Sequence, residues 1–387
     1  MKSYISIRGH LLKRARKWAR RPLEVRIMVN LRVVNWRCIE NLELQLAKIN
    51  IFVGKNSTGK SSLAYATYFA SKSRSVDPQY LLTQLYGCGF DKVARLVEDR
   101  PQFPITVGID GSEFSVKPSE LIKIPKLPGE TERPKDVRQT AEFEITKPSS
   151  SPWVDEFLLP SRRVNFIQII MLLPKIVGEL RTKPQSALIQ SFIGGLFELF
   201  KSLPLFPPFG MFALDYTRAL TGIQLESASG EIKDAGSYVV NIHPLFSLIE
   251  LTVQDPYINL QLPAELAPDG LLDFSIFDSM TQKIPKNSLV VIEEPEIHKN
   301  PLMVIEFTER ITKRVLDKDI TLIMTTHSDI PLITIGKLVA EKVLRAADVK
   351  IYYLTRDPWT KLSEIKVYED GTLESLPDTE KLITHLF

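Results

Sequence analysis

The stretch GKNSTGKSS at residues 54–62 places glycines, a lysine and several hydroxyl groups at a spacing that can do chemistry on phosphate. It fits the pattern G-x-x-x-x-G-K-[ST], in which backbone N–H groups turn around the phosphates of a nucleotide. The lysine contacts the β and γ phosphates, and the next hydroxyl group binds Mg²⁺. The residues predicted to bind ATP are Gly54, Lys55, Asn56, Ser57, Thr58, Gly59, Lys60, Ser61 and Ser62, with Ser61 also on the metal.

A second stretch, LVVIEEPEIHKNP at residues 289–301, leads a short apolar strand directly into three glutamates. With a nucleotide and Mg²⁺ in place, Glu293 at the strand end can hold the metal through water. Glu294 can then polarise the water that attacks the γ phosphate. Neighbouring side chains on a strand point to opposite faces, but Pro295 enforces a turn here. The competing interpretation is a pair of solvated surface glutamates, which the phosphate loop disfavours.

A third apolar run, ITLIMTTHSD at residues 320–329, ends in His327. A single histidine is more often structural than functional. Ligands, however, collect at the carboxyl ends of the strands in an open α/β sheet, and three apolar runs of this chain end in residues that suit phosphate. We therefore predict that His327 senses the γ phosphate.

The elements that must position these residues alternate between strands and helices. INIFV, just before the phosphate loop, is a short apolar strand, and residues 61–70 after it are predicted to form a helix whose positive end faces the anion. LVVI is expected to be a second core strand beside INIFV. From residue 250 onward, strands and helices alternate again.

The middle of the chain is less regular. Residues 104–117 are predicted to form a hairpin that turns at Asp110 and Gly111, and residues 141–148 another strand. Residues 164–220 have helical periodicity. Because no repeat and no sustained heptads occur, we expect no long coiled coil.

Composition places the chain among ordinary globular proteins, at 387 residues, 44% hydrophobic and 25% charged. With only Cys38 and Cys88, neither a disulfide framework nor a cysteine metal site is indicated, which fits a reducing, cytoplasmic setting. No apolar run is long enough for a membrane span, and no signal peptide is recognisable.

Positive charge is concentrated at the N-terminus. Residues 1–26 hold nine Lys or Arg against the single acid Glu24, a balance of +8 that leaves 3 − 8 = −5 for the remainder. Attraction to nucleic acid would therefore have to come from this segment or from a local patch. The competing interpretation is a solvated tail without function.

The motifs GKNSTGKS, VVIEEPEIHKNP and TTHSD, in this order, resemble the ABC-type ATPase domain. Within it they resemble the SMC-like branch that includes the OLD and related stand-alone AAA ATPases. The resemblance implies an α/β fold: a P-loop NTPase with a mixed sheet flanked by helices, a helical insertion and an antiparallel β subdomain. Two departures are Glu293, where the Walker B motif usually ends in Asp, and Asn300, where the family has a second histidine.

The resemblance also implies a role for each motif. The phosphate loop would be the Walker A motif, Glu293 the Walker B acid, Glu294 the catalytic glutamate and His327 the switch histidine. Residues 296–301 would be the D-loop, which meets a second subunit. The resemblance further implies a signature loop that reaches the γ phosphate from that second subunit.

Two segments compete as the signature loop. SASGE at 227–231 matches the letters but lies 62 positions before Glu293 (293 − 231). APDGLLDF at 267–274 has the usual separation, because Gly270 lies 23 positions before Glu293 (293 − 270). We prefer the second, with Asp269 and Gly270 as phosphate contacts, although Asp269 stands where a serine would donate a hydrogen bond.

Two further motif positions are only partly assigned. LLPSRRVNF at 158–166 resembles a family segment that contains an arginine, with Arg162 as the nearest match. A surface ion pair explains Arg162 equally well. The glutamine of the family's Q-loop is not identified, and Gln168 is one option.

These expectations divide the chain into four parts. They are a basic segment (1–27), an N-terminal ATPase lobe with the phosphate loop (28–117), a connection with a helical insertion (118–250) and a C-terminal lobe with the other motifs (251–387). No nuclease domain is expected, because only 60 residues follow His327 (387 − 327).

The leading hypothesis is an ATP-hydrolysing molecular switch, a homodimer that closes around Mg-ATP and acts on a separate effector protein. The alternative is a nucleic-acid-binding repair or defence ATPase that uses the basic segment. A kinase shares the phosphate loop but does not need both Glu294 and His327.

Overall fold

The structure is a computed structural model, and it describes residues 28–119, 142–165, 207–221, 228–232, 236–243, 248–254, 260–263 and 266–377. The predictions for the basic segment 1–27 and for Gln168 lie outside these residues. Within the described part of the chain, no helix combines the length and the apolar character that crossing a membrane requires.

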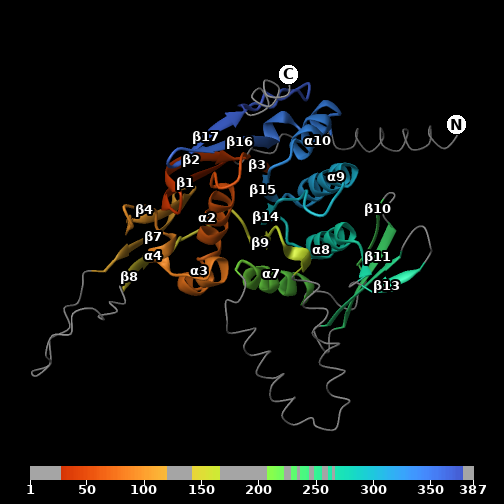
Figure 1. Ribbon diagram of the computed structural model, residues 1–387, viewed down its shortest axis with the longest axis horizontal. Helices are drawn as coiled ribbons and strands as arrows, with labels where there is room; N and C mark the ends of the chain where they lie inside the picture. The colour runs from red at the N-terminus through yellow and green to blue at the C-terminus, as the bar shows by residue number, and fades with distance from the viewer. Residues whose placement is uncertain are drawn as a thin grey trace, which may run out of the picture.

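A six-stranded sheet forms the centre of the molecule, in the order β17-β16-β3-β15-β14-β9 (Figure 1). The strands are β3 (Ile49–Val53), β9 (Glu156–Leu159), β14 (Leu289–Glu293), β15 (Thr321–Thr326), β16 (Val349–Arg356) and β17 (Thr360–Ile365). All pairs are parallel except β16 with β17. Every residue of β3 and β14 is buried, as expected for parallel strands covered on both faces.

The strand order corrects one prediction. LVVI lies in β14, but β14 does not pair with β3, because β15 lies between them. The register nevertheless aligns the strand ends: Glu293 is opposite Thr325, and Thr326 is opposite Val53. The phosphate loop, the glutamates and His327 therefore follow three neighbouring strands at one edge of the sheet.

A five-stranded antiparallel sheet, in the order β2-β1-β6-β7-β8, is the predicted antiparallel β subdomain. Its strands are β1 (Val29–Trp36), β2 (Ile39–Leu46), β6 (Ile105–Ile109), β7 (Ser112–Pro118) and β8 (Phe143–Thr146). The predicted hairpin turn is confirmed between β6 and β7, where Asp110 has φ 47° and Gly111 has φ 79°. A small hairpin, β4 (Leu96–Val97) with β5 (Arg100–Pro101), accompanies this sheet.

Helices connect and cover the sheets. They are α2 (Lys60–Lys72), α3 (Pro78–Tyr86), α4 (Phe90–Val93), α7 (Phe209–Thr221), α8 (Asp269–Lys283), α9 (Pro301–Lys318) and α10 (Asp329–Ala340), with a 3-10 turn η2 (Ala346–Asp348). Helix α2, predicted over residues 61–70, contacts strands of both the five-stranded and the six-stranded sheet. Because α2 begins directly after the phosphate loop, its packing on both sheets fixes the position of this loop.

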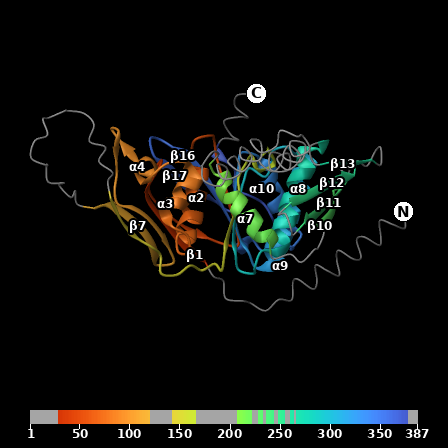
Figure 2. The ribbon, with the colours of Figure 1, turned by 90° about the horizontal axis from the view of Figure 1, so that it is seen from below.

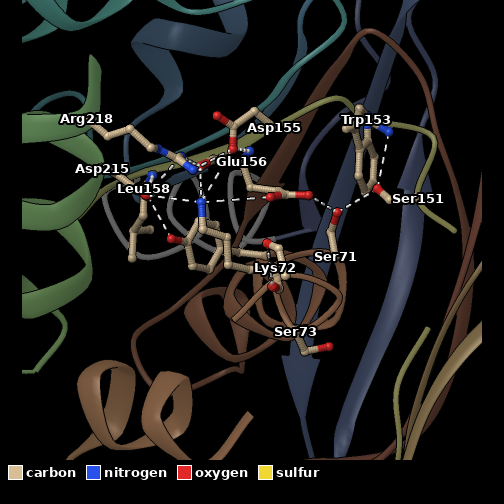
Figure 3. Close-up of polar contacts among 12 residues, drawn as sticks. Ser71, Lys72, Ser73, Ser151, Trp153, Asp155, Glu156, Leu158, Asp215 and Arg218 are labelled. Carbon is tan, nitrogen blue, oxygen red and sulfur yellow. Dashed lines mark hydrogen bonds and ion pairs between the residues drawn. The ribbon is translucent and has the colours of Figure 1, made fainter. Parts of the chain in front are cut away.

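The end of α2 is anchored by a buried ion cluster (Figure 3). Lys72 Nζ lies 3.3 Å from Asp215 Oδ1 of α7, 3.5 Å from Asp155 Oδ1 and 3.8 Å from Glu156 Oε2 of β9. Tyr68 donates a 2.7 Å hydrogen bond to Asp215. Burial raises the pKa of Asp215, and Lys72 opposes this shift. The cluster joins α2, β9 and α7, so it stabilises the placement of the phosphate-loop helix.

A four-stranded antiparallel sheet lies at the opposite end of the molecule from the five-stranded sheet (Figures 1 and 2). It consists of β10 (Ala228–Ile232), β11 (Gly236–His243), β12 (Leu248–Gln254) and β13 (Gln261–Pro263). The range 118–250, predicted as a connection with a helical insertion, therefore also contains strands. The predicted boundary at 250 cuts through β12, and β9 within this range belongs to the central sheet.

Candidate active site

Two glycines of the phosphate loop have conformations that other residues rarely adopt. Gly54 has φ 146°, and a Cβ atom there would lie 2.3 Å from the carbonyl oxygen of Leu354. Gly59, the N-cap of α2, has φ 103°, and a Cβ atom would lie 2.4 Å from Thr360 Oγ1. Both positions therefore require glycine, because a side chain would meet backbone or a buried neighbour. The loop turns between β3 and α2 as the motif predicts.

Lys60 is buried beneath this loop. Its Nζ atom donates to the carbonyl oxygens of Gly54 and Lys55, each at 2.8 Å, and lies 3.3 Å from His327 Nδ1. Burial lowers the pKa of Lys60 to about 8, against the opposing influence of the nearby glutamates Glu294, Glu296 and Glu293. The loop carbonyl oxygens thus hold the ammonium group at the centre of the loop. Phosphate oxygens of a ligand could replace these carbonyl oxygens as hydrogen-bond acceptors.

Glu293 closes β14 as a buried carboxylate. It accepts hydrogen bonds from the hydroxyl groups of Ser61 and Tyr65. Burial raises the pKa of Glu293, whereas Ser61 and Tyr65 lower it. The predicted metal residues Ser61 and Glu293 are therefore in direct contact.

A divalent ion fits this pair of residues. One hydroxyl and one carboxylate oxygen are the ligand types that Mg²⁺ takes from protein, and phosphate oxygens and water usually supply the rest. Within the described ranges, no group of three or more His, Cys, Asp and Glu residues could hold a metal ion.

Glu294 occupies the turn that follows β14. Its φ of 45° lies in the left-handed region, and its backbone N–H donates a 2.8 Å hydrogen bond to the carbonyl oxygen of Thr325. This turn removes the strand alternation, so that the adjacent Glu293 and Glu294 both face the phosphate loop. Glu294 Oε1 lies 3.2 Å from His327 Nε2. The predicted catalytic pair is thus brought together.

A third carboxylate of this stretch, Glu296, contacts the His327 segment. Its Oε1 atom accepts hydrogen bonds from the backbone N–H of His327 at 2.7 Å and from Thr326 Oγ1 at 2.8 Å. Its Oε2 atom is buried and has no hydrogen-bond partner among the residues that the structure describes. From the sequence, Glu296 was predicted only as the first residue of the D-loop. The third acid of the EEPE run was the signal that could have identified it.

A cavity of about 690 Å³ opens beside the phosphate loop. Besides residues 56–62, Glu294 and His327, it is lined by a second set of side chains, namely Arg37, Cys38, Lys92, Ala94, Leu96, Arg356 and Trp359. The guanidinium of Arg95 lies 4.7 Å from the Trp359 ring centroid. Three cations and an aromatic ring beside a phosphate loop suit an anionic ligand that carries an aromatic base. Sequence reasoning missed this second set.

The preferred signature segment does not line this cavity. Asp269 and Gly270 form the first turn of α8, so only residues 267–268 of the predicted loop precede the helix. Asp269 Oδ2 lies 3.3 Å from His298 Nδ1, and a Cβ atom at Gly270 would lie 2.7 Å from the carbonyl oxygen of His298. The competing Gly230 lies in β10, paired with Tyr238 of β11.

Two interpretations of Arg162 were left open, the arginine of a family segment and a surface ion pair. Arg162 is exposed, whereas its neighbour Arg163 is fully buried. Arg163 Nη1 donates a 2.9 Å hydrogen bond to the carbonyl oxygen of Glu293. The arginine that reaches the site is therefore Arg163, and it contacts the backbone beside Glu294 rather than the phosphate loop.

Comparison with known sequences finds a match to one family over part of the chain. The model of a family described as "AAA ATPase domain" matches residues 27–159, a range that includes the phosphate loop. No curated protein sequence matches the chain significantly. The match agrees with the ATP site predicted from residues 54–62.

Comparison with solved structures identifies the fold. The Smc head domain of Pyrococcus furiosus, with an extended coiled coil and bound to the C-terminal domain of ScpA, matches with TM-score 0.50 and 10% identity over 93% of this chain and 99% of that chain. The Smc head domain with a coiled coil and joint from Pyrococcus yayanosii matches with TM-score 0.49 and 9% identity over 93% and 99%. The SMC head domain of Thermotoga maritima matches with TM-score 0.43 and 11% identity over 88% and 99%. The first of these supports the predicted P-loop ATPase fold.

Proposed function

We propose that this chain, an SMC-like AAA ATPase, works as a nucleotide-driven molecular switch in which two copies close around Mg-ATP and separate after hydrolysis. One observation carries the proposal. His327 lies within reach of both the phosphate-loop lysine and the catalytic glutamate, with Nδ1 3.3 Å from Lys60 Nζ and Nε2 3.2 Å from Glu294 Oε1. A γ phosphate held by Lys60 would therefore meet His327 and Glu294 together.

Each residue of the site has a distinct role in this proposal. Lys60 and the backbone of the loop bind the β and γ phosphates. Glu294 accepts a proton from the attacking water, and His327, which lies between Lys60 and Glu294, senses the γ phosphate and orients the Glu294 carboxylate. Ser61 and Glu293 would hold Mg²⁺, which when bound neutralises charge on the phosphates.

The second set of cavity residues supports ATP as the ligand. Trp359 and Leu96 offer apolar surface to the base, and Arg37, Lys92 and Arg356 offer positive charge. The structure describes no acidic lining residue other than Glu294. We infer that the base of ATP stacks near Trp359, while its triphosphate runs along residues 56–62.

Dimer closure is supported by site residues and apolar side chains that remain exposed in a single chain. The side chains of Glu294 and His327 are 29% and 32% exposed, so this chain alone does not exclude water from the reacting end. Asp269 is part-exposed and lies outside the cavity of its own chain, as a contact made to a second chain requires, whereas its neighbour Gly270 is buried. Leu266 and Leu302, near the starts of α8 and α9, are 67% and 74% exposed. A second copy would cover these groups.

An effector protein is the proposed recipient of the motion. The Smc head of Pyrococcus furiosus is bound to the C-terminal domain of ScpA. A protein-binding role for this chain would resemble that arrangement. The alternative, binding of nucleic acid, is favoured by the +8 charge of residues 1–26 alone.

Two substitutions test the hydrolytic part of the proposal. Lys60→Ala should abolish ATP binding, whereas Glu294→Gln should keep binding and stop turnover. Lys60 contacts the ligand's charge in the ground state, and Glu294 acts only on the attacking water. ATP affinity measured by calorimetry and phosphate release measured by a coupled assay separate the two effects. Equal ATP affinity in Lys60→Ala and the wild type would contradict the assignment of the loop.

A further inference from the structure

Two buried cationic side chains donate hydrogen bonds to the backbone on either side of Glu294. Arg163 Nη1 donates to the carbonyl oxygen of Glu293 at 2.9 Å, and Lys299 Nζ donates to the carbonyl oxygen of Pro295 at 2.9 Å. Glu294 lies between these carbonyls with φ 45°. Because left-handed backbone is uncommon for a residue with a side chain, this turn needs support from its surroundings.

Both cations share one carboxylate, that of Asp273 on α8. Arg163 Nη2 donates to Asp273 Oδ2 at 2.7 Å and Arg163 Nε donates to Oδ1, while Lys299 Nζ also donates to Oδ2. The side chains of Arg163, Asp273 and Lys299 are 0%, 2% and 0% exposed. Burial by itself would raise the pKa of Asp273, but Arg163 and Lys299 hold it below its ordinary value. Asp273 is therefore an ionised centre that fixes both cations.

The remaining positive charge is held by aromatic rings. Two cations against one carboxylate leave an excess of one charge, and Lys299 Nζ lies 4.2 Å from the Phe307 ring centroid and 5.9 Å from that of Phe274. Burial lowers the pKa of Lys299 to about 8, and Asp273 opposes this shift. The Lys299 ammonium group therefore contacts aromatic rings as well as the Asp273 carboxylate.

The same helix is tightly fitted against the segment that follows Glu294. A Cβ atom at Gly270, one turn before Asp273, would lie 2.7 Å from both the carbonyl oxygen of His298 and Met303 Cε. Asp269 pairs with His298. A displacement of the first turns of α8 would therefore carry the Glu294 turn with it.

We propose that Asp273 is a positioning residue: through Arg163 and Lys299 it holds the Glu294 turn in its hydrolytic geometry and couples this turn to the N-terminal end of α8. The inference rests on the proposed role of Glu294 in hydrolysis. If Asp273 has this role, the start of α8 controls turnover rather than ATP binding. The same part of α8 carries the preferred signature residues.

Helix α8 supplies a matched control for the test. Asp278 lies five positions after Asp273 (278 − 273) and is also a buried carboxylate, paired with Arg310 Nη1 at 2.6 Å. It accepts a hydrogen bond from Tyr238 and so connects α8 to the four-stranded sheet instead of the Glu294 turn. Asp278→Asn therefore removes a similar buried charge from the same helix and leaves the hydrogen bonds of Arg163 and Lys299 to the Glu294 turn in place.

The experiment compares Asp273→Asn, Lys299→Met and Asp278→Asn in the full chain, all below the melting temperature of each variant. The first two should lower kcat roughly 10- to 100-fold, with the Kd for ATP within about threefold of wild type, because a small misplacement of a reacting group costs rate rather than binding. Asp278→Asn should keep kcat within about threefold of wild type. In single-turnover assays on a Glu294→Gln background, Asp273→Asn should lower the residual rate no further.

The inference is overturned if Asp273→Asn and Lys299→Met turn over as fast as Asp278→Asn. It is also overturned if Asp273→Asn slows the Glu294→Gln variant by the same factor as it slows the wild type. Should Asp273→Asn fail to fold, Lys299→Met decides by the same criteria, because it leaves the balanced pair of Arg163 and Asp273 in place. Failure of the proposed function is recognised separately, as normal turnover by Glu294→Gln alone.

Discussion

His327 Nε2 lies 3.2 Å from Glu294 Oε1, although 33 positions separate the two residues in the chain (327 − 294). The contact arises because β14 and β15 are parallel neighbours whose ends are in register at Glu293 and Thr325. The other ring nitrogen of His327 faces Lys60. A side chain that connects the predicted phosphate-binding lysine with the proposed catalytic glutamate could report the presence of a γ phosphate.

Glu296 should act on turnover through His327. Glu296→Ala removes the acceptor of the His327 N–H and Thr326 hydrogen bonds and should lower kcat roughly 10-fold or more, because the ring loses its orientation. Glu296→Gln keeps an oxygen acceptor and should retain more activity than Glu296→Ala. Steady-state phosphate release measures both. On a His327→Ala background, Glu296→Ala should cause no further loss, and an equal loss on both backgrounds would contradict this role.

ATP binding should take up a proton near pH 8. Burial lowers the pKa of Lys60 to about 8 in the free protein. Bound phosphates favour the charged lysine and so raise this pKa, so affinity should be constant below pH 8 and fall as the pH rises above it. Calorimetry in buffers of different ionisation enthalpy measures the uptake. Lys299→Met serves as the control, because Lys299 has a similar pKa outside the cavity. Unchanged affinity from pH 7 to 9.5 would refute the prediction.

Trp359 should contribute to affinity for the base. Trp359→Ala should weaken ATP binding by about 1 to 3 kcal/mol, the usual effect of removing an aromatic ring stacked on a base. Trp359→Phe should retain most of the affinity, and kcat should change little in either variant, since the ring lies away from the reacting atoms. Fluorescence titration with a nucleotide analogue gives the Kd values. A Trp359→Ala variant that binds ATP like the wild type would place the base elsewhere.

The two signature candidates predict opposite results. If the start of α8 contacts a second chain, Gly270→Arg should block ATP-driven dimerisation and leave ATP binding by the monomer intact. The close fit to His298 means that its folding must be checked by thermal melting. Gly230→Arg in β10 should then be mild. Loss of dimerisation in Gly230→Arg, with Gly270→Arg behaving like the wild type, would transfer the role to residues 227–231.

The sequence predicted the local motifs of the site better than it predicted which distant segments lie beside them. The phosphate loop, the turn after Glu293 and the strand end at His327 follow from short patterns in which each residue type has a physical reason. That β15 separates β3 from β14 depends on long-range pairing, which no local pattern specifies. Trp359 and Arg37 come from turns in different sheets, so nothing near them in sequence indicates a shared cavity.

Two other features could not be fixed from local sequence. Arg162 and Arg163 are adjacent just after β9, and a single residue decides which one is buried, so composition could not choose between them. Strands β10 and β11 lie in the range 118–250, predicted as a connection with a helical insertion, whereas most of β12 and all of β13 lie beyond residue 250, where strands were expected. The helical periodicity of residues 164–220 is confirmed where α7 is described, from Phe209 to Thr221.

ATP should bring two copies of this chain together, and light scattering of the Glu294→Gln variant can detect this dimer. This variant should bind ATP and Mg²⁺ without releasing phosphate, so the closed state should accumulate. We predict a mass of about 44 kDa without nucleotide and about twice that with ATP and Mg²⁺, based on a chain mass of 44.0 kDa. A Lys60→Ala, Glu294→Gln double variant should stay at the lower mass. An unchanged mass of Glu294→Gln with and without ATP and Mg²⁺, under conditions where calorimetry shows that ATP is bound, would contradict the account.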